Sequence, residues 1–159
     1  MSALPMKVLI AVDDSAHSEY ALKSIMLRPW ADGTEFLVFS VIEPFHPDFA
    51  GWEHSALEHA EKFAAEQEGK RKKYLEDYAA KLRSTFPNAK VEHEAFENSR
   101  IKESIIQKAI DWKADLIIMG SHGRTGLERF LLGSVSQAVV AHAPCSVEIV
   151  KHSERHSSN

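Results

Sequence analysis

Short apolar runs alternate along this chain with longer segments whose apolar residues recur at helical spacing, and this alternation limits the fold more than any other feature. The runs cover residues 7–12, 35–41, 90–96, 116–119 and 146–150. Brief runs without polar alternation are typical of strands buried on both faces of a parallel sheet. The run at 90–96 alternates more than the others, which favours a place at the edge of the sheet.

Four segments between or after these runs have the spacing of amphipathic helices. A serine at position 15 is expected to cap the first of them. The second segment, about 52–86, is dense in charge, and we expect Gly69 to break or bend it. The apolar residues that define the four helical faces are Ala21, Leu22, Ile25 and Met26; Leu75, Tyr78, Ala79, Leu82 and Phe86; Ile101, Ile105, Ala109 and Trp112; and Val135, Ala138 and Val139.

The alternation predicts an α/β fold with a single open, mostly parallel five-stranded sheet and helices on both faces, as in Rossmann-like proteins. We expect the strand order 3-2-1-4-5. Strands one and four are then neighbours, so Asp13 and Gly120, which end them, face the same crevice. Ligands of such sheets bind at the carboxyl ends of the strands, where the strand order reverses.

Composition limits the number of domains and the kinds of partner. A chain of 159 residues with 44% apolar content suits one compact domain, which we place at residues 1–151, with a flap at about 43–55 and a disordered polar tail at 152–159. The net charge of −4 and pI near 6.1 disfavour nucleic acid as a partner.

Cysteine usage and hydropathy predict the compartment. The single cysteine, Cys145, cannot form an internal disulfide and is interpreted as a small core residue. The first residues lack the pattern of a signal peptide, and no apolar run approaches the ~18 residues of a membrane span. We therefore expect a soluble cytoplasmic protein that does not bind membranes.

The segment between Gly120 and Ser134 carries the strongest functional signal. Spaced glycines, among them Gly123 and Gly133, lie here between an apolar run and a probable helix start. Glycine permits positive φ and close approach of a ligand to the backbone, and the first turn of a helix offers unpaired N–H groups and a partial positive charge. The segment therefore predicts a phosphate site, and with it a nucleotide.

The spacing Gly120-x2-Gly123-x9-Gly133-Ser134, with Asp13 ending the first strand and Pro144-Cys145 before the last, resembles the ATP-binding branch of the universal stress protein family. The resemblance implies ATP, accompanied by Mg²⁺ or Mn²⁺ held through the phosphates rather than by protein ligands. It implies no catalytic residue. The residues that it places around the nucleotide are Val12 and Asp13 near the ribose, Val41 reading adenine through its backbone, Met119, Gly120, His122 and Gly123 along the ribose and phosphates, and Gly133, Ser134, Val135 and Ser136 at the phosphates.

Each of these residues also has a purely structural interpretation. Ser15 and Ser134 are both typical helix caps, and Asp13 is typical of a turn at a strand end. Arg124 and Arg129 could add bonds to phosphate, but long basic side chains usually end in solvent. The histidines do not predict zinc, because His54 and His59 are not on one helical face.

Three functions are compatible with the sequence. The first is a nucleotide-responsive regulator in the stress response. The second is a slow ATPase, or an autophosphorylating enzyme that modifies Ser134, Ser136 or another nearby hydroxyl. The third is a chaperone-like dimer that does not depend on nucleotide. A homodimer through the last strand, Ser146–Val150, is implied by the resemblance and would cover an exposed edge.

Overall fold

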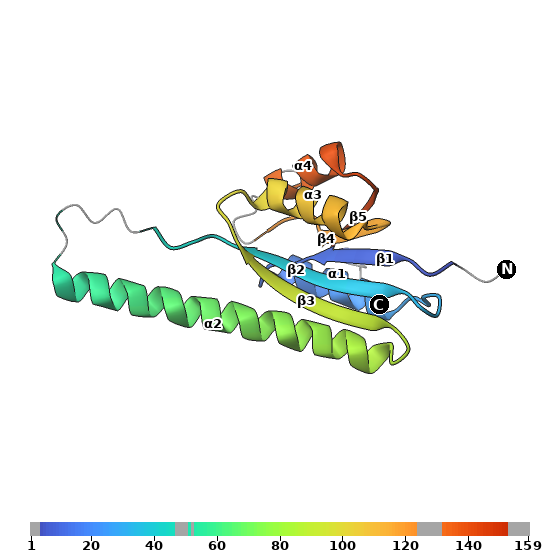
Figure 1. Ribbon diagram of the computed structural model, residues 1–159, viewed down its shortest axis with the longest axis horizontal. Helices are drawn as coiled ribbons and strands as arrows, with labels where there is room; N and C mark the ends of the chain where they lie inside the picture. Colours follow the sequence, from blue (N-terminus) through green and yellow to red (C-terminus); the bar gives the residue numbers. More distant parts are fainter. Residues whose placement is uncertain (1–3, 47–50, 52, 124–131, 153–159) are drawn as a thin grey trace, which may run out of the picture.

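The fold is an alternating succession of strands and helices, as predicted. The computed structural model describes residues 4–46, 51, 53–123 and 132–152. Within them the chain forms β1 (Lys7–Ala11), α1 (Ala16–Met26), β2 (Glu35–Ile42), α2 (His54–Thr85), β3 (Lys90–Glu97), α3 (Ile101–Trp112), β4 (Leu116–Gly120), α4 (Ser134–His142) and β5 (Ser146–Val150) (Figure 1).

The sheet has the predicted topology. All pairings are parallel, and the strand order is β3-β2-β1-β4-β5. Ala11 of β1 pairs with Phe39 of β2 and with Met119 of β4. Asp13 and Gly120 therefore lie just beyond the same pairing row, at the carboxyl edge of the sheet. The edge position predicted for the third strand is also confirmed.

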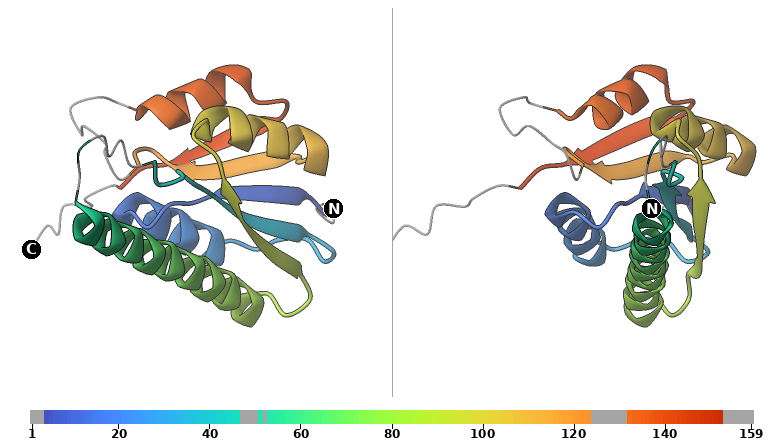
Figure 2. Two further views of the ribbon diagram at one scale, coloured as in Figure 1. Left: turned by 60° about the vertical axis from the view of Figure 1, so that its left-hand side comes forward. Right: turned by 90° about the vertical axis from the view of Figure 1, so that its left-hand side faces the viewer.

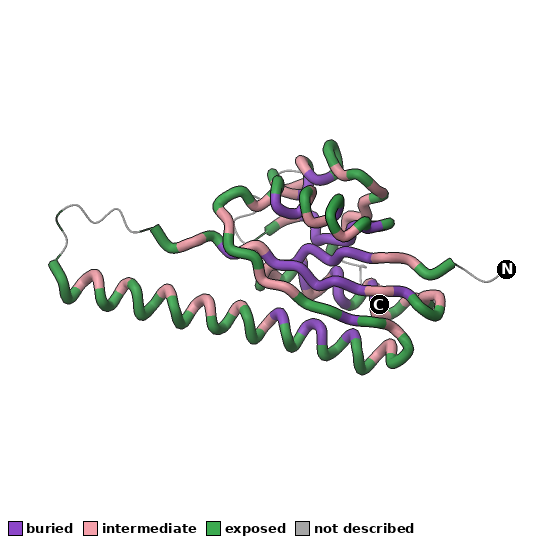
Figure 3. The backbone as a smooth tube through the Cα atoms, viewed as in Figure 1, coloured by how far each residue is buried: buried purple, intermediate pink, exposed green. Residues whose placement is uncertain are grey.

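Helices cover both faces of the sheet, α1 and α2 on one and α3 and α4 on the other (Figure 2). Alternate residues of β1 divide between the two cores: Val8 and Ile10 pack toward α1 and α2, and Leu9 and Ala11 toward α3 and α4. The central strands are buried on both faces (Figure 3). The uninterrupted apolar runs form the inner strands, because both faces of these strands are covered by helices and need apolar side chains.

The long helix α2 departs from the prediction at Gly69, where no break occurs. It runs through this glycine as one helix of 32 residues. A Cβ at Gly69 would have open space around it. Its buried residues Leu75, Tyr78, Ala79 and Leu82 lie in the C-terminal half, and the N-terminal half extends past the carboxyl ends of β2 and β3 (Figures 1 and 3). Exposed pairs one helical turn apart, such as Lys72 with Glu68, stabilise such a helix locally.

Two predicted segments lie partly outside the described residues. Of the flap at 43–55, residues 47–50 and 52 are outside them, as are 153–159 of the predicted tail. Arg124 and Arg129 are outside as well. The predicted cap at Ser15 is confirmed, since its side chain accepts from the Ser18 amide.

Candidate functional site

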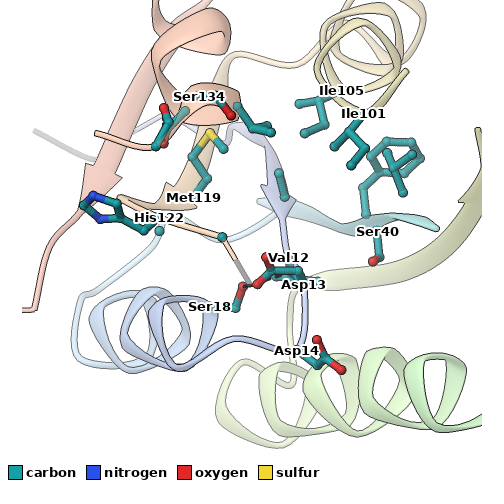
Figure 4. Close-up of a pocket in the computed structure, with 18 of the residues that line it drawn as sticks. Val12, Asp13, Asp14, Ser18, Ser40, Ile101, Ile105, Met119, His122 and Ser134 are labelled. Atoms are coloured by element: carbon teal, nitrogen blue, oxygen red, sulfur yellow. Dashed lines mark hydrogen bonds between the residues drawn. The ribbon is translucent and has the colours of Figure 1, made fainter. Parts of the chain in front are cut away.

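A cavity of about 570 Å³ opens at the carboxyl edge of the sheet, where β1 and β4 part. This volume is in the range of small-molecule sites. All the residues that the sequence predicted around a ligand line it: Val12, Asp13, Val41, Met119, Gly120, His122, Gly123, Gly133, Ser134, Val135 and Ser136. Tertiary structure thus brings together segments that lie as far apart in the chain as β1 and α4 (Figure 4).

The cavity has two ends, which differ in the strands that supply them. The β4 end comprises Gly120, Gly123, Gly133, Ser134 and Val135. The β2 end comprises Ser40, Val41, Glu43, Arg71 and Tyr74. Between them lies the end of β1, with Val12 and Asp13 (Figure 4).

Asp13 is held by the start of α1. Its Oδ1 accepts hydrogen bonds from the Ser15 amide and from the Ser18 hydroxyl, both at 3.0 Å. The Asp13 amide in turn donates to Ser18 Oγ at 3.0 Å. The turn role that aspartate often has at a strand end is therefore present here. Oδ2 points to the glycine segment, because it lies 3.0 Å from the position that a Cβ on Gly123 would take.

The β4 end is closed by contacts to the Ser121 carbonyl. This oxygen accepts from the Gly133 amide at 2.7 Å and from the Ser136 hydroxyl at 2.8 Å. The Ser121 amide donates to Val150 of β5 at 3.1 Å, so the end of β4 is also tied to the edge strand. The start of α4 is thereby fixed against the end of β4.

Gly133, rather than Ser134, is the N-cap of α4. Its carbonyl accepts from the Gln137 amide at 2.9 Å. The amides of Ser134, Val135 and Ser136 come before the first intrahelical donor and have no acceptor within the helix. They border the cavity, so the helix presents its positive end there.

The three glycines are needed because a side chain would not fit, and not because they adopt positive φ. The expectation of positive φ in this segment is therefore wrong. None of Gly120, Gly123 and Gly133 has positive φ. A Cβ on Gly120 would lie 2.6–2.9 Å from His17 Cβ and backbone atoms, and one on Gly133 would lie 3.3 Å from His122 Cα. At Gly123 the nearest atom is the tip of Asp13. Two glycines therefore permit close packing of backbone, and Gly123 keeps the cavity open.

An apolar wall on the α3 side faces the strand ends. It consists of Phe39 and Val41 from β2 together with Ile101 and Ile105 from α3 (Figure 4 labels the two isoleucines). Such a surface suits a flat apolar group, while the polar groups needed for orientation come from Asp13 and the start of α4. The sequence analysis assigned both isoleucines only to a helix face.

Sequence reasoning missed the contribution of α2. Arg71 and Tyr74 line the cavity from this helix, which the sequence presented as a solvated, charge-rich segment. Burial, followed by the charge of Glu19, raises the pKa of the Tyr74 hydroxyl. The hydroxyl is buried, and the Glu19 carboxylate is close enough to act on its pKa but does not meet the geometry of a hydrogen bond with it. The spacing of Arg71, Tyr74 and Tyr78 along one side of the helix was the only available signal.

His122 stands at the rim of the cavity beside His17 of α1. Their ring centroids are 5.2 Å apart, and the Ser121 hydroxyl lies 3.0 Å from His122 Nδ1. Among the residues that the structure describes, no three histidine, cysteine or carboxylate side chains gather as metal ligands would.

Cys145 packs against the α3–α4 core as a partly buried side chain. Burial is the main cause that raises the pKa of its thiol. No helix in the described ranges is both long enough and apolar enough to cross a bilayer.

The fold and the cavity together define a doubly wound α/β protein with a ligand-sized site at the point where the strand order reverses. Residues 6–151 match the universal stress protein family. The chain belongs to this family.

Individual relatives and solved structures are similar to nearly the whole chain. A Thermus aquaticus protein named "universal stress protein in QAH/OAS sulfhydrylase 3′ region" is 35% identical over 150 residues, which cover 91% of this chain and 97% of the relative. The solved structure of the hypothetical protein MJ0577 is 27% identical with a TM-score of 0.77, covering 96% of this chain and 99% of that one. An Arabidopsis thaliana family member with AMP bound is 16% identical with a TM-score of 0.63, covering 98% and 97%.

Proposed function

We propose that this protein binds an adenine nucleotide, ATP with Mg²⁺ or Mn²⁺ carried on its phosphates, and acts as a nucleotide-responsive regulator in the stress response. The observation that carries the proposal is the start of α4 at the β4 end of the cavity. Three amides without helical acceptors border it, and Gly123 leaves the backbone accessible. A triphosphate matches these donors in charge and in hydrogen bonding.

The remaining lining suits the rest of the nucleotide. Carboxylate oxygens of Asp13 can accept from ribose hydroxyls, and the apolar wall of Phe39, Ile101 and Ile105 can pack against a purine. The backbone of Val41 at the end of β2 is available to read the edge of the base. A relative described with bound AMP supports an adenine nucleotide as the ligand class.

Gly123→Val tests the proposal. The new side chain would enter the cavity beside Asp13 without meeting described backbone within 4 Å, so the fold should persist. We expect the affinity for Mg-ATP, measured by isothermal titration calorimetry, to fall about 100-fold, which corresponds to about 2.7 kcal/mol.

Gly69→Val is the matched control, because a Cβ there has open space and Gly69 is not one of the residues that line the cavity. It should bind like the wild type. Equal affinity of Gly123→Val and wild type would refute the proposed site. Retention of nucleotide by the purified wild-type protein after gel filtration would support it directly.

The enzymatic alternative has a narrower basis. The hydroxyl of Ser136 is buried and already donates to the Ser121 carbonyl, which leaves Ser134 as the better placed acceptor for a phosphoryl group. Incubation with labelled Mg-ATP distinguishes the two functions. A regulator yields no ADP or phosphoprotein above the level of Gly123→Val, whereas an enzyme does.

The proposed regulator also dimerises through β5. This strand is at the sheet edge, and four of its five side chains are half-buried within one copy. Edge-to-edge pairing with a second copy would satisfy its open hydrogen-bonding groups. Light scattering at micromolar concentration should show a dimer, and a monomer at that concentration would contradict this part of the proposal.

A further inference from the structure

Arg71 lines the cavity as a cation that pairs with none of the described residues. It is half-buried, and within the described part of the chain it takes part in no ion pair or hydrogen bond. Its neighbours on α2 differ: Lys72 pairs with Glu68, and Lys73 pairs with Asp77 at 3.0 Å. One turn further along the helix, the buried hydroxyl of Tyr74 also lacks a hydrogen-bond partner among the described groups. Both groups therefore have hydrogen-bonding capacity that no described residue uses.

The position of α2 places Arg71 at the β2 end of the cavity. This helix packs against β2, β3 and α1. The start of α4, by contrast, follows β4, and β1 lies between β2 and β4 in the sheet. Arg71 and the free amides of α4 thus approach the cavity from opposite sides of the end of β1.

The charges along the cavity orient an anionic ligand. Asp13, Asp14 and Glu43, which follow β1 and β2, line it, and Asp14 lies next to α2 (Figure 4). These carboxylates disfavour phosphate at the β2 end, whereas the positive end of α4 favours it at the β4 end. A nucleotide whose phosphates meet Ser134 and Val135 therefore turns its base toward β2 and α2.

We propose that Arg71 is a nucleobase-binding residue, whose planar guanidinium packs on or donates to the purine. The assignment rests on the proposed function, since it assumes that a nucleotide occupies this cavity. A guanidinium is planar and weakly hydrated, so it stacks on aromatic rings better than an ammonium does, and its fork of donors matches the acceptors on a purine edge.

Titrations with adenosine, AMP and Mg-ATP test the assignment, because these ligands share a base and differ in phosphate number. For Arg71→Gln we expect about tenfold weaker binding of all three ligands. Arg71→Lys keeps the charge and loses the planar group, so it should bind adenosine as weakly as Arg71→Gln does. Circular dichroism melts of each variant show whether the fold is retained.

Lys70→Gln is the matched control, because it removes the same charge from an exposed neighbour on the same helix. It should leave all three affinities unchanged. A loss that grows from adenosine to ATP would overturn the assignment by placing Arg71 at the phosphates, and an equal loss in Lys70→Gln would overturn it by showing a long-range charge effect. Unchanged binding by Arg71→Gln would overturn it and leave the proposed function intact. A wild-type protein that binds none of the three ligands would refute both.

Discussion

The two ends of the cavity are built from different parts of the polypeptide. At the β4 end backbone packs directly on backbone: Gly120 lies against His17, and the Ser121 carbonyl binds both Gly133 and Ser136. At the β2 end the wall is completed by two long side chains of α2, Arg71 and Tyr74. Neither side chain has a hydrogen-bond partner among the described residues. The comparison indicates that substitutions of Gly120 and Gly133, which pack on backbone, should act on folding, whereas those at Gly123 and at the β2 end should act on ligand binding.

Gly120→Ala should have the largest effect on stability. The added methyl group would lie 2.6 Å from His17 Cβ and 2.8–2.9 Å from its carbonyl group, so α1 must move away from β4. We expect a loss of about 3 kcal/mol in the free energy of unfolding, measured by urea denaturation. A loss below about 0.5 kcal/mol would show that this contact is not tight, and the contrast between the two ends would then fail.

Gly69→Ala should act in the opposite direction, because this glycine lies in a continuous helix with open space around it. Alanine has the higher helix propensity, so the same assay should show a gain of about 1 kcal/mol. This substitution is the same chemical change as Gly120→Ala, so the pair compares a glycine packed on backbone with a glycine that has open space around it. A loss of stability in Gly69→Ala would indicate that α2 makes a close contact at this position with something other than its own chain.

Tyr74→Phe should have the smallest effect on the free protein. Its hydroxyl is buried without a hydrogen-bond partner among the described groups, so its removal relieves a desolvation cost. We expect a gain of about 0.5 kcal/mol in the free energy of unfolding. A loss greater than about 1 kcal/mol, measured by urea denaturation without ligand, would show that the hydroxyl has a partner in solution.

Much of this architecture could be predicted because the relevant signals are local. The buried strand at Val8–Ala11 and the apolar face through Ile105 and Ala109 were visible as runs and as helical spacing. The strand order was the one expected of a Rossmann-like sheet, and the lining at Asp13 and Gly120 followed from that order. The motif between Gly120 and Ser134 identified the family before any coordinates were considered.

Other features depended on contacts that no local pattern encodes. Gly69 looked like a helix break, but α2 continues because its C-terminal half is fixed against the sheet and exposed charge pairs support the rest. The glycines at 120 and 133 looked like residues needed for positive φ, whereas their neighbours in space require the absence of a side chain.

The sequence by itself determined the alternation of strands and helices, the inner and edge strands, and the glycine-lined start of α4, since each of these depends on the properties of consecutive residues. Only the tertiary structure decided that α2 reaches the cavity and that Arg71 stands opposite α4. The physical reason for the first is that packing on distant strands sets the direction of α2 beyond its buried segment. The reason for the second is that Arg71 lies in a run of charged residues, where the sequence pattern does not distinguish it from its neighbours.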